Sequence, residues 1–192
     1  MIAGRSYGSS ERRWRGALTL LLAIYGWLCL QNPRTYRWLD SLDLAIHETG
    51  HLVFSFGGEF LTLLGGTLLQ LIVPLAFLVA LWRQGDRHGA TVPLWWLGQN
   101  CWNVSIYNKD ARAQELPLVG GGEHDWALML AELDWLHRDQ VIGGAVFFVG
   151  FLLYLAALVI GWKALSSGGE ADSSRSRTDG DFVTLPEAGD RR

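Results

Sequence analysis

The sequence predicts an all-α protein, a polytopic membrane helix bundle of about four to five spans in which a membrane-embedded helix carries an H-E-x-x-H motif. Three observations lead to this fold class. Hydrophobic residues make up 49% of the chain and charged residues only 18%, which is below the ~25% of a typical soluble domain. The charged residues are also bunched. Ten tryptophans are present, several of them at the ends of apolar segments, where indole rings favour the headgroup level of a bilayer.

Four windows of the chain contain no Asp, Glu, Lys or Arg: residues 16–31, 60–82, 89–108 and 140–162. A helix needs ~20 largely apolar residues, within a range of ~17–25, to cross the hydrocarbon core of a bilayer. Three of the windows are long enough. The window at 16–31 is slightly short, but its flanking residues can extend the helix. We therefore expect an integral membrane protein with a helical membrane domain over residues 16–165.

The two ends of the chain differ from this domain in composition. Residues 1–15 form a basic segment, and the positive-inside tendency places this segment in the cytoplasm. Residues 166–192 are rich in Ser, Gly, Asp and Arg, so we expect a disordered tail. The tail has no charge block of the kind that binds nucleic acid, so no nucleic-acid partner is expected. The compact size and the arginine-rich start favour a bacterial inner (plasma) membrane, with lipid as the immediate surroundings.

The central motif of the chain is His47-Glu48-Thr49-Gly50-His51. Residues at i and i+4 share one face of a helix, so both imidazoles can bind the same ion. In the H-E-x-x-H pattern the two histidines bind Zn²⁺ and the glutamate is the general base. The sequence therefore predicts Zn²⁺ as the cofactor, with His47 and His51 as metal ligands and Glu48 as the catalytic residue.

The helix that carries the motif is expected to begin near residue 40 and to end near Phe56. Asp40 or Ser41 has the character of an N-cap, and the following Gly57-Gly58 pair is typical of a C-terminal break. Asp43 lies four residues before His47 and shares its face. Two roles are open for this carboxylate: orienting the ring of His47 from behind, or favouring the helix N-terminus electrostatically.

A catalytic zinc site has three protein ligands, so a third ligand is expected outside the motif. Whether or not the motif helix crosses the bilayer, two further spans return the chain to its Gly57 end, where the long loop at 109–139 begins. The loop offers three candidates. His124 and Asp125 rank equally because they follow three glycines that allow a tight turn, and Asp110 ranks third.

Polar amides interrupt two of the apolar windows. Gln70 lies in the 60–82 window, and Gln99, Asn100 and Asn103 lie in the 89–108 window. Amides at membrane depth face other helices or a wet cavity, so they either join helices or line a substrate cleft. Gly65 and Gly66 in the earlier window allow a close approach of another helix. The two cysteines, Cys29 and Cys101, are expected to be buried free thiols.

The chain resembles the intramembrane metalloproteases of the site-two protease family. The resemblance is carried by the motif, which matches that family's H-E-x-G-H on a membrane-embedded helix followed by further spans. It implies His47 and His51 as zinc ligands and Glu48 as the general base. The family takes its third ligand from an Asp in an N/L-P-x-P-x-x-x-D-G type of segment. Residues 116–125 are loosely similar, with Trp126 in place of the family's final Gly.

The function that follows is a zinc-dependent intramembrane metallopeptidase, an enzyme that hydrolyses a peptide bond in a membrane or membrane-adjacent substrate. The alternative is a non-enzymatic membrane subunit of a larger complex, whose histidines bind a structural metal or a pigment. Glu48 discriminates between the two, because a peptidase needs a base and a structural site does not. A hydrolase of a lipid or of another membrane amide would use the same residues.

Overall fold

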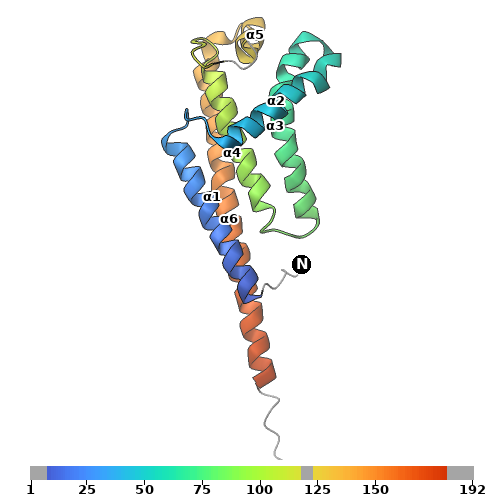
Figure 1. Ribbon diagram of the computed structural model, residues 1–192, viewed down its shortest axis with the longest axis vertical. Helices are drawn as coiled ribbons and strands as arrows, with labels where there is room; N and C mark the ends of the chain where they lie inside the picture. Colours follow the sequence, from blue (N-terminus) through green and yellow to red (C-terminus); the bar gives the residue numbers. More distant parts are fainter. Residues whose placement is uncertain (1–7, 118–122, 181–192) are drawn as a thin grey trace, which may run out of the picture.

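The computed structural model describes residues 8–117 and 123–180, which form helices and connecting turns with no strand among them. The all-α prediction is confirmed for these residues (Figure 1). The helices, in chain order, are α1 (Ser9–Gln31), α2 (Trp38–Phe54), the 3₁₀ turn η1 (Ser55–Gly57), α3 (Gly58–Arg83), α4 (Thr91–Lys109), α5 (Asp125–Glu132), the 3₁₀ turn η3 (Leu136–Arg138) and α6 (Asp139–Gly180).

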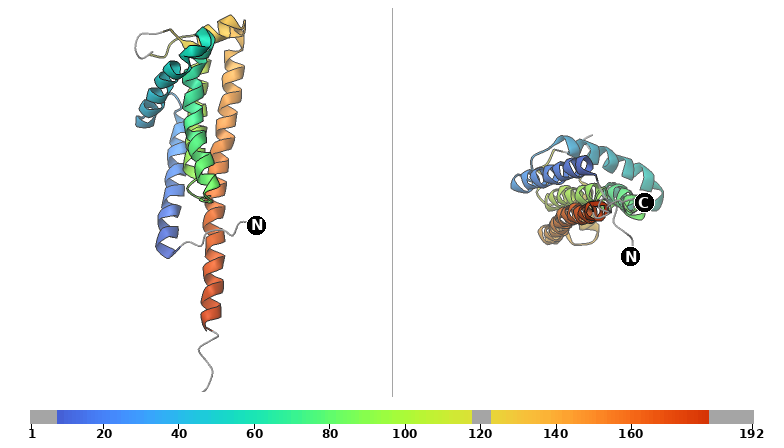
Figure 2. Two further views of the ribbon diagram at one scale, coloured as in Figure 1. Left: turned by 90° about the vertical axis from the view of Figure 1, so that its right-hand side faces the viewer. Right: turned by 90° about the horizontal axis from the view of Figure 1, so that it is seen from below.

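Helices α1, α3, α4 and α6 run alongside one another, while α2 crosses obliquely toward one end of the bundle (Figures 1 and 2). The main contacts of α4 are with α6 and α3, and α2 packs against α3. Helix α5 and the junction of α2 with α3 lie at the same end (Figure 1). We call this the α5 end; α1 begins and α6 ends away from it.

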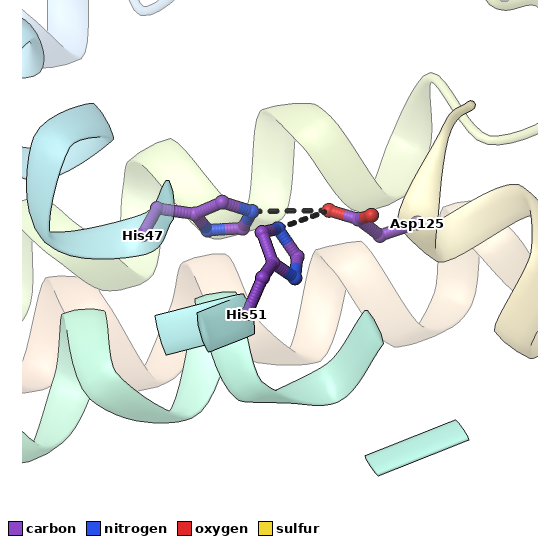
Figure 3. Close-up of side chains that lie close together, drawn as sticks. All are labelled: His47, His51 and Asp125. Carbon is purple, nitrogen blue, oxygen red and sulfur yellow. Dashed lines mark hydrogen bonds and ion pairs between the residues drawn. The ribbon is translucent and has the colours of Figure 1, made fainter. Parts of the chain in front are cut away.

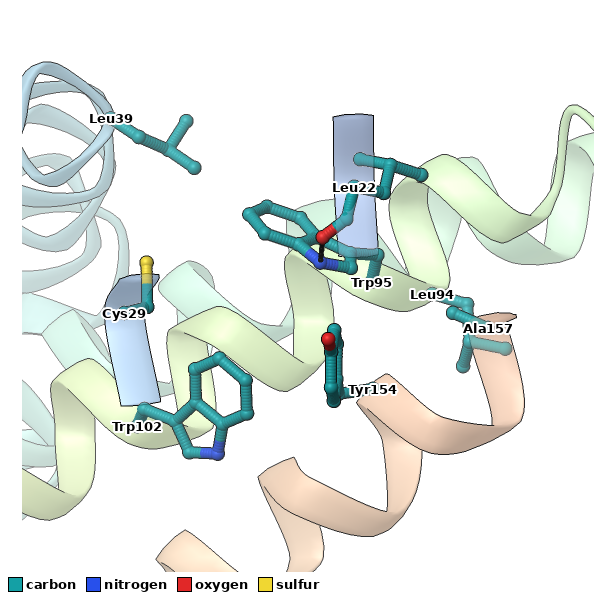
Figure 4. Packing of buried hydrophobic residues seen from close by; sticks show 8 residues of the cluster. All are labelled: Leu22, Cys29, Leu39, Leu94, Trp95, Trp102, Tyr154 and Ala157. Carbon is teal, nitrogen blue, oxygen red and sulfur yellow. Dashed lines mark hydrogen bonds between the residues drawn. The ribbon is translucent and has the colours of Figure 1, made fainter. Parts of the chain in front are cut away.

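The core lies where α1, α4 and α6 meet (Figure 4). Trp95 and Tyr154 are buried there, and each donates a hydrogen bond to a carbonyl of α1: Trp95 Nε1 to Leu22 O at 2.9 Å and Tyr154 Oη to Ala23 O at 2.9 Å. Helices α4 and α6 approach closely because Gly98 and Gly150 face each other's backbone. Aromatic rings thus fix the position of α1, and small residues set the spacing of the other two helices.

Within the described residues, two helical segments, Trp38–Arg83 and Leu136–Ser166, are long and apolar enough to cross a membrane. The core helix of a soluble protein can be equally long and apolar, but it is mostly buried. Here only 28% of the most apolar window of Trp38–Arg83 and 22% of that of Leu136–Ser166 are buried within the protein. Large apolar side chains such as Phe77, Phe148 and Leu152 instead face outward. Both cysteines are buried and free, as expected.

The structure differs from the predicted helix boundaries at two points. Helix α2 begins at Trp38, so Asp40 is not its N-cap but its third residue, where its Oδ2 accepts a hydrogen bond from Arg37 N at 2.6 Å. Helix α6 continues to Gly180, through the first part of the expected disordered tail. Residues 167–180 contain no proline, and elongating an existing helix adds one hydrogen bond per residue. The predictions for residues 1–7 and 181–192 fall outside the described residues.

Candidate metal centre

The two histidines of the motif and one aspartate of α5 converge on a single point (Figure 3). His47 and His51 project from the same face of α2, with ring centroids 4.8 Å apart. Oδ2 of Asp125 lies 3.0 Å from Nε2 of His47 and 3.4 Å from Nε2 of His51. Ligand atoms of the three residues all lie within 4.8 Å of one another, so the group could hold a metal ion.

The other nitrogen of each imidazole faces an oxygen atom. Nδ1 of His51 lies 2.8 Å from the carbonyl oxygen of Thr62, and Nδ1 of His47 lies 3.1 Å from Oε1 of Gln70. Both oxygens accept hydrogen bonds and cannot donate them. Each Nδ1 therefore carries a hydrogen and donates it, which leaves Nε2 of each ring as the atom that faces the carboxylate and could bind a metal.

Three acceptor atoms that face one another need a cation or protons between them. Protonating both rings would place two positive charges side by side in a site where the His47 side chain is only 9% and the Asp125 side chain only 11% exposed. One divalent ion would satisfy all three atoms. Zinc bonds of ~2.0–2.2 Å in a tetrahedron separate the ligand atoms by about 3.4 Å, close to the 3.0 and 3.4 Å that separate Asp125 Oδ2 from the two Nε2 atoms. The three residues could therefore hold a metal ion.

Asp125 is held in place by its neighbours in the fold. It is the first residue of α5, and its backbone N–H donates to the hydroxyl of Tyr107 on α4 at 3.2 Å. The same hydroxyl lies 3.4 Å from Oδ2 of Asp125. The preceding residue, His124, is the N-cap of α5, since its Nδ1 accepts from Ala127 N at 3.3 Å. The ring of His124 also stacks on Tyr107, with centroids 4.1 Å apart.

The other two loop candidates, His124 and Asp110, pair with each other and not with the motif. Nε2 of His124 lies 3.5 Å from Oδ2 of Asp110. The carboxylate also accepts the backbone N–H groups of Glu115 and Leu116 at 3.1 and 3.0 Å. Burial lowers the pKa of His124 and outweighs the nearby carboxylates of Asp110 and Asp125. Of the three predicted candidates, the structure brings only Asp125 to the histidines; the other two support the loop that carries it.

Asp43 forms no hydrogen bond or ion pair with His47 in the described part of the chain, although the two share a face of α2. It is fully buried and accepts a hydrogen bond from Nε1 of Trp96 at 2.8 Å. The partner of His47 is Gln70 on α3, a residue that the sequence marks only as polar at membrane depth. Asn103 on α4 bonds Gln70 in turn at 3.1 Å. An amide inside an apolar window was the available signal, but it did not indicate which residue the amide would contact.

Glycines allow α2 and α3 to approach closely enough for this arrangement. A Cβ at Gly50, inside the motif, would collide with the backbone of Gly65. A Cβ at Gly66 would lie 2.5 Å from Nε2 of His47. The ring of His47 therefore packs directly on the backbone of α3, where Gln70 can reach it. The close approach predicted for Gly65 and Gly66 is confirmed.

Glu48 is exposed on α2 and lines a cavity of about 530 Å³ together with the metal-site residues. The cavity extends from the turn between α1 and α2, past the amides of α3 and α4, to the loop before α5. Its lining includes Arg34, Arg37, Gln99, Asn103, Tyr107 and Leu116. The candidate ligands are thus open to a space large enough for a short segment of chain, with the candidate base in its wall.

Comparison with family models, with curated proteins and with solved structures finds no match to this chain. The assignment of the site rests on its own residues and geometry.

Proposed function

We propose that this chain is an integral-membrane zinc metallopeptidase of the site-two protease type, which hydrolyses a peptide bond in a membrane or membrane-adjacent substrate. The observation that carries the proposal is the convergence of His47, His51 and Asp125 beside a cavity that Glu48 also lines. Three protein ligands next to an open space are typical of catalytic zinc sites, whereas structural sites are closed by four ligands.

The distribution of charge supports a membrane orientation. The end of the bundle where α1 begins carries many basic residues, and positive residues mark the cytoplasmic side. These include Arg12, Arg13, Arg15, Arg83, Arg87 and Lys163. Between 109 and 139, the α5 end carries three basic residues, Lys109, Arg112 and Arg138. In this orientation the metal centre lies toward the leaflet opposite the cytoplasm, and the outward apolar side chains of α3 and α6 face lipid.

The chain's own residues suit amide hydrolysis. A zinc ion bound by the three ligands would polarise the scissile carbonyl and lower the pKa of a water molecule toward ~7. Glu48 would take the proton of that water and pass it to the leaving amine. Tyr107, whose hydroxyl bonds both the backbone and the carboxylate of Asp125, would keep that ligand in position. The cavity holds the substrate segment against these groups.

The test is hydrolysis by the purified, zinc-loaded full chain in detergent, with quenched fluorescent peptides that carry an apolar segment. Glu48→Gln should lower the rate by about 10²–10⁴-fold, the usual contribution of a general base. Glu59→Gln is the matched control, because Glu59 is exposed at the start of α3 and does not line the cavity. A Glu48→Gln protein as active as the control would contradict the proposal. It would favour a structural metal in a non-enzymatic subunit of a larger complex.

A further inference from the structure

We propose that Asp40, Asn103 and Gln70 form a hydrogen-bond relay that fixes the tautomer of His47, so that its Nε2 is always free to bind the metal. The inference rests on the metal centre of the proposed function. It assigns three positioning residues on three helices, all of which line the cavity. None of them contacts the metal position directly.

Each link of the relay has a defined direction. Nδ2 of Asn103 donates to Oδ1 of Asp40 at 3.4 Å, and Nε2 of Gln70 donates to Oδ1 of Asn103 at 3.1 Å. Oε1 of Gln70 is then left to accept from Nδ1 of His47 at 3.1 Å. The hydrogen bonds therefore all run in one direction. They lead from His47 on α2 to Gln70 on α3, then to Asn103 on α4, and end at the carboxylate of Asp40 on α2.

The relay needs an anchor because an amide can turn over. The oxygen and nitrogen of Asn and Gln exchange places when the group rotates by half a turn, which reverses every bond that it makes. His51 does not have this problem, since its Nδ1 donates to the backbone carbonyl of Thr62, which cannot reverse. For His47 the only group in the relay that cannot reverse is a carboxylate, Asp40.

Asp40 is surrounded by donors that hold it in this role. Its Oδ2 accepts from Arg37 N at 2.6 Å, and its Oδ1 accepts from Nε2 of Gln99 at 3.0 Å as well as from Asn103. These three hydrogen bonds oppose the effect of burial, which disfavours a charged carboxylate. The residue thereby caps the start of α2 and orients the amide of Asn103 with the same side chain.

This arrangement predicts that Asp40→Asn reverses the relay. The backbone N–H of Arg37 would hold the oxygen of the substituted side chain, which turns its new NH₂ group toward Asn103. Asn103 and then Gln70 would turn over, and Nε2 of Gln70 would donate to Nδ1 of His47. The hydrogen of His47 would move to Nε2, where it blocks metal binding. Loss of an outer partner of a metal ligand costs about 10–100-fold in affinity, and we expect an effect of that size.

A second substitution makes the inference specific. In Gln70→Glu the side chain accepts from His47 and from Asn103 whichever way it turns, so the direction of the relay no longer matters. The double variant Asp40→Asn with Gln70→Glu should therefore recover zinc affinity close to that of the wild type. Asp43→Asn is the matched control, because Asp43 is a buried carboxylate on the same helix whose hydrogen-bond partners are Trp96, Gln99 and Asn100, and not Asp40, Asn103 or Gln70. Its zinc affinity should stay at the wild-type value.

The experiment is a zinc-affinity measurement on the four detergent-purified proteins by competition with a chromogenic chelator. Support requires a loss in Asp40→Asn, recovery in the double variant and no loss in Asp43→Asn. If the wild type binds zinc and Asp40→Asn binds it equally well, or if Gln70→Glu brings no recovery, the relay is refuted while the metal site stands. If the wild type binds no zinc, the relay and the proposed function both fail.

Discussion

At the scale of single residues, Asp125 is the group that turns a pair of histidines into a three-ligand site. We predict that Asp125→Asn lowers zinc affinity by more than the roughly 10–100-fold that loss of an outer partner costs. The reason is that the substitution removes the only negative charge among the three converging atoms. The measurement is chelator competition with the full chain in detergent.

Asp110→Asn is the control for this prediction. Asp110 lies in the same loop region, but its carboxylate accepts backbone N–H groups and faces His124. An asparagine oxygen can still accept one of those hydrogen bonds, so zinc affinity should change little. Equal losses of affinity in the two variants would show that the loop as a whole, and not a ligand, had been disturbed.

The sequence predicts part of this site and leaves part open, for a physical reason. His47, Glu48 and His51 follow from spacing along one helix, which is a local property. Asp125 and His124 are adjacent in the chain and have equal claims as ligands. His124 caps α5, and Asp125 is left to face the histidines of α2. Contacts with Tyr107 on α4 determine which of the two residues takes each position. Gln70 as the partner of His47 likewise depends on how α3 packs against α2.

At the scale of elements, the contact of α2 with α3 positions the metal centre. We predict that Gly66→Ala lowers zinc affinity by at least about tenfold, because a Cβ there would lie 2.5 Å from Nε2 of His47. The ring would have to move, and metal ligands tolerate displacements of only about 0.5 Å. Zinc affinity and thermal stability should be measured together, since the affinity is expected to fall more than the stability.

Gly144→Ala provides the comparison for the glycine substitution. Gly144 lies in α6, and a Cβ at this position meets no atom within 4 Å. The same change of residue should therefore leave zinc affinity unaltered, and removing a helical glycine should if anything favour the fold. If Gly66→Ala bound zinc as tightly as Gly144→Ala, His47 would not be packed against α3 as described.

The sequence predicts those helices that are marked by a long run of residues without charge. The four windows without charged residues correspond to α1, α3, α4 and the first half of α6, and the break after the motif lies at η1 and Gly58, whose φ is +83°. The oblique course of α2 was not predictable, because the alternatives of spanning and not spanning have the same sequence pattern. Its direction is set by Gly50, Gly65 and Gly66 together.

At the scale of the whole molecule, a buried polar cluster ties α1 to the turn between α3 and α4. Arg15 pairs with Asp86 at 3.0 Å, and Thr19 Oγ1 lies 3.0 Å from Nε2 of His88, which is fully buried. Burial, together with the charge of Arg15, lowers the pKa of His88 below its usual 6.5, against the opposing effect of Asp86. Folding therefore favours the neutral form of this histidine.

The stability of the protein should depend on pH through this group. As the pH falls through 6.5, the ordinary value for histidine, the unfolded chain is protonated at His88 to a greater extent than the folded chain, so stability falls as the pH falls. Thermal unfolding in detergent between pH 7.5 and 5 (roughly the range over which histidine titrates) should show this loss, and His88→Gln should reduce it. His137→Gln, at an exposed position, should leave the pH dependence as it is; an unchanged dependence in His88→Gln would contradict the prediction.

If this chain binds a catalytic metal ion, the purified protein should contain it, so the decisive measurement is metal content. Zinc should be measured in the detergent-purified full chain for the wild type, His51→Ala and Glu48→Gln. We predict about one zinc per wild-type chain, the stoichiometry of a three-ligand catalytic site. We also predict loss of the metal in His51→Ala and its retention in Glu48→Gln. A wild-type protein that carries no metal even after zinc is supplied would show that His47, His51 and Asp125 are not a metal site.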